Sequence, residues 1–182
     1  MNRRLPIAIL MMASILVPTS GGQTRRDPLN PDEADQVAEM GDRPIERVKL
    51  YVKYIEQRIS DLKQLTAVHT AEHRTAQIHA KLDEFTRLAD ELQDNLDTLA
   101  DRHSDIRKSL KELGPVIAKW PEVLNATPPD PVYDFSRKTA LEATDSLTEQ
   151  TKKLLEEQEA YFKAHPDEKG KNGTGPDAPP KQ

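Results

Sequence analysis

Three side chains in one five-residue stretch are of the types that bind zinc. His69, Glu72 and His73 belong to the run HTAEH at 69–73. On a helix, residues four apart lie one turn apart on the same face, so the two imidazoles would reach one metal ion. Glu72 would lie beside them, where a carboxylate can take a proton from a metal-bound water. The stretch therefore offers one hypothesis for function, a zinc-binding protein or a metallohydrolase.

The spacing resembles the H-x-x-E-H pattern of the inverted zinc peptidases. The resemblance covers five residues and implies that His69 and His73 bind zinc, with Glu72 as the general base. It also implies a third ligand from a distant acidic residue, and a large catalytic domain that mixes helices with sheet. This chain is shorter, has no strand pattern and specifies no third ligand. We therefore expect a solvated helix start here, no enzyme and no cofactor.

Other catalytic signatures are missing from the sequence. The chain has no cysteine, which excludes a thiol nucleophile and haem attachment through cysteine. None of its five histidines has a glutamate three residues earlier, as the carboxylate di-iron bundles require. It also contains neither a G-x-S-x-G elbow nor a glycine-rich phosphate loop. No complete catalytic set can be assembled from these residues.

The first residues have the order of a secretory signal peptide. Two arginines precede an apolar run at 5–17, and small residues follow at 18–22. The run is shorter than the ~20 residues that a membrane span needs. We therefore predict that residues 1–22 are removed by cleavage after Gly22, or after Gly21. The alternative is an uncleaved N-terminal anchor.

Charge and cysteine content narrow the classes of partner and location. Residues 23–182 carry 24 basic and 31 acidic side chains, a net charge of −7. Nucleic-acid binding needs a surplus of Lys and Arg, so we expect no nucleic-acid partner. An exported chain without cysteine is held by its core alone. We expect a protein of the bacterial envelope, periplasmic or secreted, which is soluble after signal removal and has no stable membrane span.

Helical periodicity dominates the chain after a short N-terminal segment. Within residues 23–42, Asn30 and Glu33 form a capping-box pattern that predicts a helix at 31–40. No Gly or Pro occurs from 45 to 113, and apolar residues recur there at steps of three and four, which indicates helices with one buried face. The first apolar series comprises Ile45, Val48, Val52, Ile55, Ile59 and Leu62. The second comprises Ile78, Leu82, Phe85, Leu88, Leu92, Leu96, Leu99, His103, Ile106, Leu110, Leu113 and Ile117.

The two series are out of phase between Leu62 and Ile78. A hairpin turn at 66–70 explains the shift, and predicts helices at about 44–66 and 70–113. The alternative is one unbroken helix with a stutter in its apolar seam.

Prolines and glycines divide the remainder of the chain. Gly114-Pro115 is expected to end or sharply kink the long helix, with a short piece at 116–124 after it. A last helix at 132–164 follows, and a Pro- and Gly-rich tail at 165–182 is expected to be disordered. The predicted seam of this last helix includes Phe135, Ala140, Ala143, Leu147, Leu154 and Tyr161.

These elements predict an all-α fold. Residues 43–164 would form an elongated antiparallel bundle of three long helices and one or two short ones, with seams like those of a coiled coil.

Two further residues are candidates for function. His103 takes a seam position where leucine is expected, so it could set register or respond to pH near neutrality. Trp120 is the only tryptophan and precedes Pro121, where it could anchor a partner or belong to the core.

The sequence favours a non-enzymatic interaction protein, acting as scaffold, adaptor or holdase in the cell envelope. Its outline is similar to that of periplasmic helical chaperones. However, the run LTEQ at 147–150 is one residue short of the L-T-x-x-Q pattern of the small stress-induced members. The alternatives are the zinc protein of 69–73 and a self-associating structural coiled coil. The partner is accordingly another protein or a second copy of the chain.

Overall fold

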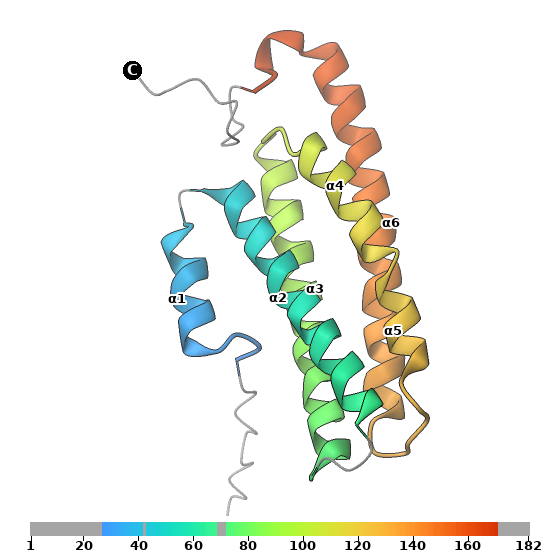
Figure 1. The fold of residues 1–182 in the computed structure, drawn as a ribbon. Coiled ribbons are helices and arrows are strands. Elements are labelled where there is room, and N and C mark those ends of the chain that lie inside the picture. The colour runs from blue at the N-terminus through green and yellow to red at the C-terminus, as the bar shows by residue number, and fades with distance from the viewer. Residues whose placement is uncertain (1–26, 42, 69–71, 171–182) are drawn as a thin grey trace, which may run out of the picture.

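The computed structural model describes residues 27–41, 43–68 and 72–170, and every regular element in them is a helix (Figure 1). The predicted all-α antiparallel bundle is confirmed, with three long helices. Three shorter α-helices accompany them, where one or two were expected. In chain order the elements are α1 (Pro31–Glu39), α2 (Pro44–Ala67), α3 (Arg74–Asp101), α4 (Arg107–Ile117), α5 (Trp120–Ala126), α6 (Asp134–Ala164) and the 3₁₀ turn η1 (Pro166–Glu168).

Helix α3 is the central element of the elongated bundle. It packs against α2 on one side and α6 on another, while α4 and α5 lie in succession along α6 (Figure 1). Both predicted apolar series, apart from Val52 and His103, are buried between these helices. The fully buried side chains of α3 are Ile78, Leu82, Phe85, Leu88, Ala89, Leu92 and Leu96.

The connection between α2 and α3 is a hairpin, as predicted, and not a continuous helix. Helix α2 ends at Ala67 and α3 begins at Arg74. Arg74 donates from Nε to the Leu65 carbonyl at 2.7 Å and from Nη2 to the Thr66 carbonyl at 3.3 Å. The last carbonyls of a helix lack intrahelical partners, and a cation at that end is favoured by the helix dipole. Arg74 therefore closes the hairpin from the first turn of α3.

The predicted single helix at 70–113 is wrong, because α3 ends at Asp101 and α4 begins at Arg107. His103 adopts a left-handed backbone with φ of 52°. Its N–H donates to the Ala100 carbonyl at 2.9 Å, and the Ser104 N–H donates to the Leu99 carbonyl at 3.0 Å. This pair of bonds is a Schellman motif, which usually has glycine at the left-handed position. The apolar series continues across the break because Ile106 is buried on the far side of it.

Gly114-Pro115 lies inside a helix, so the prediction that it ends one is wrong. Helix α4 continues through Pro115 to Ile117, and α5 begins at Trp120 after a short turn. A proline inside a helix removes the hydrogen bond to the carbonyl four residues earlier. That carbonyl belongs to Lys111, which is exposed, as is Pro115. Water can satisfy the freed carbonyl there, so the proline is tolerated.

The seam of α6 differs from the predicted one at both of its ends. Phe135 is 80% exposed, and Phe162 is buried where Tyr161 was expected. The buried face includes polar residues that an apolar pattern overlooks, so the periodicity was assigned one position out of step at these ends. The buried residues of α6 are Ser136, Ala140, Ala143, Thr144, Leu147, Thr151, Leu154, Gln158 and Phe162.

A buried ion pair fastens α1 to the bundle. The capping box is confirmed, since Asn30 and Glu33 cap each other's backbone. Arg58 of α2 also donates to both carboxylate oxygens of Glu33, at 2.7 and 2.6 Å, and to the Pro28 carbonyl at 2.8 Å. Its Nε lies 2.8 Å from Glu84 Oε2 of α3. One guanidinium therefore joins three segments of the chain.

The charges of this cluster stabilise one another. Burial alone would raise the pKa of Glu33, but the hydrogen bonds from Arg58 and from the Asn30 backbone outweigh it, and the pKa lies below its usual value. The hydrogen bond to Glu33 in turn raises the pKa of Arg58. The contribution of Glu33 to stability is therefore present above its unfolded pKa and is lost as pH falls through the lower folded pKa.

Removing the arginine should destabilise the fold strongly. Arg58→Ala leaves Glu33 buried and unpaired, and we expect it to lower the free energy of unfolding by about 3–5 kcal/mol. Urea unfolding followed by circular dichroism measures the change. The matched control is Lys49→Ala, which removes an exposed pair with Glu46 and should cost less than about 1 kcal/mol. Equal losses of unfolding free energy in the two variants would contradict a special role for Arg58.

Candidate functional site

The described part of the predicted zinc site lies in a turn and not on a helix. Glu72 and His73 precede α3, and His73 has a left-handed φ of 54°. Their side chains are 90% and 79% exposed, with Glu72 Oε1 and His73 Nε2 3.5 Å apart. His69 lies outside the described residues. Within residues 27–41, 43–68 and 72–170, no three His, Asp or Glu side chains are grouped so as to hold a metal ion.

Trp120 is a core residue in this fold. Its side chain is fully buried, and its ring meets Phe85 edge to face with centroids 5.5 Å apart. The indole Nε1 donates a hydrogen bond to Glu56 of α2. This satisfies the one polar group of the ring. A side chain without exposed surface cannot contact a partner directly, so the anchor role is not available to it in this fold.

The burial of Trp120 predicts its fluorescence. As the only tryptophan, it should emit at shorter wavelength than free tryptophan and resist quenching by iodide. Steady-state fluorescence of the native protein measures both properties, with the urea-unfolded protein as the control. Quenching of the native protein as strong as that of the unfolded protein would place the ring at the surface.

His103 is exposed and does not occupy the buried seam, so the predicted seam position is wrong. Its imidazole stacks on the Tyr161 ring with centroids 4.3 Å apart and an interplanar angle of 8°. His165 stacks on Tyr161 as well, at 4.4 Å. The Tyr161 hydroxyl donates to Glu168 Oε2 at 2.6 Å, which draws η1 towards the same place. These rings join the end of α6 to the α3–α4 turn.

Replacing His103 with leucine tests whether this position is a buried seam or an exposed turn. In a buried seam leucine would stabilise the protein, whereas in this exposed turn it removes the stacking of the imidazole on Tyr161, which should cost about 0.5–1.5 kcal/mol. We expect His103→Leu to destabilise the protein in urea unfolding. His79→Leu is the control, because His79 lies within the right-handed helix α3, and it should change stability by no more than about 0.5 kcal/mol.

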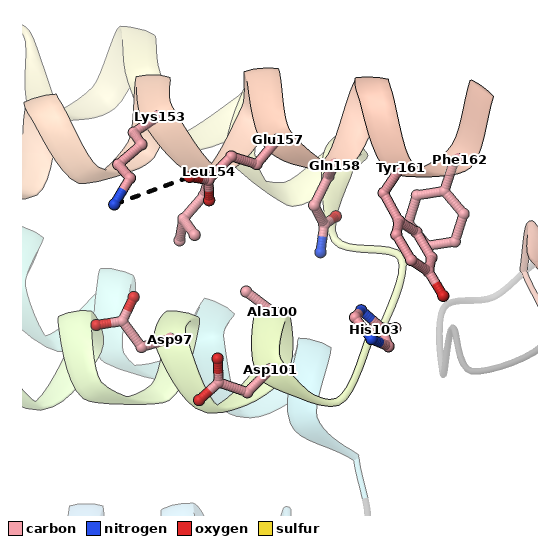
Figure 2. A pocket seen from close by; sticks show the side chains of 10 residues that line it. All are labelled: Asp97, Ala100, Asp101, His103, Lys153, Leu154, Glu157, Gln158, Tyr161 and Phe162. Atoms are coloured by element: carbon pink, nitrogen blue, oxygen red, sulfur yellow. Dashed lines mark ion pairs between the residues drawn. The ribbon is translucent and has the colours of Figure 1, made fainter. Parts of the chain in front are cut away.

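A groove of about 390 Å³ lies between the C-terminal parts of α3 and α6 (Figure 2). Asp97 and Asp101 line its α3 side, and Lys153 and Glu157 line its α6 side, as an ion pair 3.8 Å apart. Its lining is acidic on balance, which favours a cation over an anion. The remaining lining residues are Ala100, His103, Leu154, Gln158, Tyr161 and Phe162.

Gln158 closes the inner side of this groove. Its Nε2 donates to the Ser104 carbonyl at 2.7 Å, and its Oε1 accepts from the Ile106 N–H at 3.0 Å. It therefore satisfies the backbone of the α3–α4 break and has a structural role.

Tyr51, whose phenol pKa is raised, also has a structural role. Burial, together with the charge of Glu91, raises the pKa of Tyr51 to about 12. The hydroxyl stays protonated throughout the physiological pH range, so Tyr51 acts as a hydrogen-bond donor between α2 and α3. A residue that does not change protonation near neutral pH is poorly suited to acid–base catalysis.

Among the residues that the structure describes, three large apolar side chains are exposed, and all lie at one end of the bundle. They are Phe135 at 80%, Val132 at 60% and Val68 at 51% exposure. Figure 1 shows that the α2–α3 hairpin and the α5–α6 connection meet at this end. We call these residues the apolar end. Sequence periodicity missed it, because Phe135 follows a helical spacing that fits the predicted seam.

Hydrogen bonds hold the backbone that presents this end. The buried Tyr133 donates its hydroxyl to the Pro128 carbonyl at 2.8 Å. Asp130 accepts from the Val132 N–H at 2.9 Å, and its carbonyl accepts from the Asp134 N–H at 2.9 Å. Phe135 therefore projects from the first turn of a helix with an ordered start, which is a suitable support for a contact residue.

Comparison with known proteins gave no match, whether with protein families, with curated proteins or with solved structures. None of the helices in the described part of the chain combines the length and the apolar character needed to cross a membrane.

Proposed function

We propose that this chain is an exported, non-enzymatic helical interaction protein of the bacterial cell envelope, and that it contacts a protein partner through the apolar end. Phe135 is the observation that carries the proposal. A phenyl ring that is 80% exposed on an ordered helix is costly to leave in water, and aromatic residues are enriched at binding hot spots. Contact with another protein would remove Phe135 from water.

The chemistry of the described residues supports a binding role over catalysis. Arg58 and Tyr51, whose pKa values are shifted, serve helix packing and are not gathered in a cleft. Glu72 and His73 lie in a turn before α3, so these two residues do not have the helical spacing that the zinc hypothesis assumes. The zinc hypothesis therefore gains no supporting observation among these residues.

The burial of the seams supports contact through the end of the bundle. Leu88, Leu92 and Leu96 of α3 have no exposed surface within a single chain. A structural coiled coil that shared this seam between chains would need the bundle to open first. The apolar end is accessible without such a rearrangement.

Site-specific photocrosslinking tests the proposal. A photoreactive phenylalanine analogue at position 135 should form adducts with a distinct envelope protein or with a second copy, in cells that make the full chain. Mass spectrometry of the same material should show a processed chain starting at Gln23, or at Gly22 for the alternative cleavage.

The control carries the analogue at Asp145, which is exposed on the same helix. It should give few adducts. Equal labelling from both positions would argue against a specific contact at the apolar end, and an unprocessed cytoplasmic chain would remove the export part of the proposal.

A further inference from the structure

A second groove lies beside the apolar end, between the last turns of α2 and the first turns of α3. Its volume is about 360 Å³, which exceeds that of a phenyl ring, and its apolar lining comes from Leu65 and Val68. Lys81 lines it too and forms an ion pair with Glu84. Glu84 also contacts Arg58, which holds α1. The groove therefore opens on the side of the α2–α3 pair that carries α1. Its other lining residues are Asp61, Gln64 and Gln77.

Phe135 is the most exposed large apolar side chain of the described residues, and it lies on α6, whereas the groove lies between α2 and α3. Figure 1 shows α6 and α1 on opposite sides of the α2–α3 pair. The ring is 80% exposed and is not among the residues that line the groove, so it does not fill the groove of its own chain. The chain thus carries an apolar projection and an apolar recess on different helices.

We infer that Phe135 of one copy binds in the α2–α3 groove of a second copy. This inference rests on the proposed function and names its partner. A contact between two different surfaces is heterologous, so each copy in a chain of copies uses its ring on one neighbour and its groove on the other. Association of this kind continues beyond the dimer unless the copies close into a ring.

The charges around the two surfaces are complementary. Lys138 and Glu142 follow Phe135 by three and seven residues and are mainly exposed, with their charged groups 3.6 Å apart. Asp61 and Lys81 line the groove, 3.5 Å apart. Each surface thus offers one acid and one base. Lys138 can face Asp61 while Glu142 faces Lys81, which gives the docked ring a preferred orientation.

The size of the contact predicts weak association. A buried phenylalanine accounts for roughly 150–250 Å². Stable interfaces bury about 1,200–2,000 Å² in total, so one ring with its charged surroundings gives a small, reversible contact. The native chain should therefore be a monomer at low concentration, and its average mass should rise with concentration.

Complementation between two variants tests the inference. Phe135→Ala removes the ring and keeps the groove, while Val68→Asp keeps the ring and places a charge in the groove. In sedimentation velocity on protein purified from cells that make the full chain, each variant alone should stay monomeric over about a hundredfold range of concentration. An equimolar mixture should form dimers and nothing larger, because only one productive contact remains.

Both positions are exposed, so the variants should fold as the parent does, and circular dichroism checks this. If Val68→Asp does not fold, Gln77→Trp blocks the same groove from α3, where Gln77 is exposed. Asp145→Ala is the matched control on α6 and should associate like the parent.

Three results would overturn the inference. They are a native chain that remains monomeric, a mixture of the two variants that remains monomeric, and either variant alone that still associates. Crosslinking from position 135 distinguishes failure of this inference from failure of the proposed function. Adducts with a different protein would retain the proposed function and reject self-association, whereas the absence of any specific adduct would reject both.

Discussion

The packing of α3 is the constraint on which the rest of the structure depends. Its apolar residues face both α2 and α6, so one helix supplies the core for two interfaces. The chain has no cysteine, so burial of apolar side chains is what holds these helices together. An unfolded or shifted α3 would expose the seams of both neighbours at once. The seams are closed within one chain, and the exposed large apolar side chains of the described residues lie at one end of the bundle.

The ends of the bundle are held by polar interactions that the seams do not provide. Arg74 satisfies the last carbonyls of α2 at the hairpin, and Gln158 satisfies the backbone of the α3–α4 break. Arg58 fastens α1 across the outside of the same helices. Arg74 and Gln158 each make two hydrogen bonds at a place where helix continuity is lost, whereas Arg58 acts from the interior of α2. The apolar end adjoins the first of these junctions, so its exposed side chains are presented by an ordered support.

Whether a contact could be predicted from the sequence depends on how far apart its two residues lie along the chain. The Asn30–Glu33 capping box was predictable because both partners lie within four residues. The pairing of Glu33 with Arg58 was not predictable, since 25 residues separate them and only the packing of α1 on α2 brings them together. The helix end at His103 was not predictable for a related reason. His103 occupies a left-handed turn that usually takes glycine, and histidine there gives little local signal of a helix end.

The sequence by itself determined the helical class, the apolar series of α2 and α3 and the hairpin between them. These follow from periodicity and capping, which are properties of neighbouring residues. The tertiary structure alone decided that Trp120 is buried beside Phe85 and that Phe135 is exposed. Both are aromatic residues in the first turn of a helix. Which one reaches the core depends on the direction in which each helix leaves its turn, and that direction is set by contacts between distant parts of the chain.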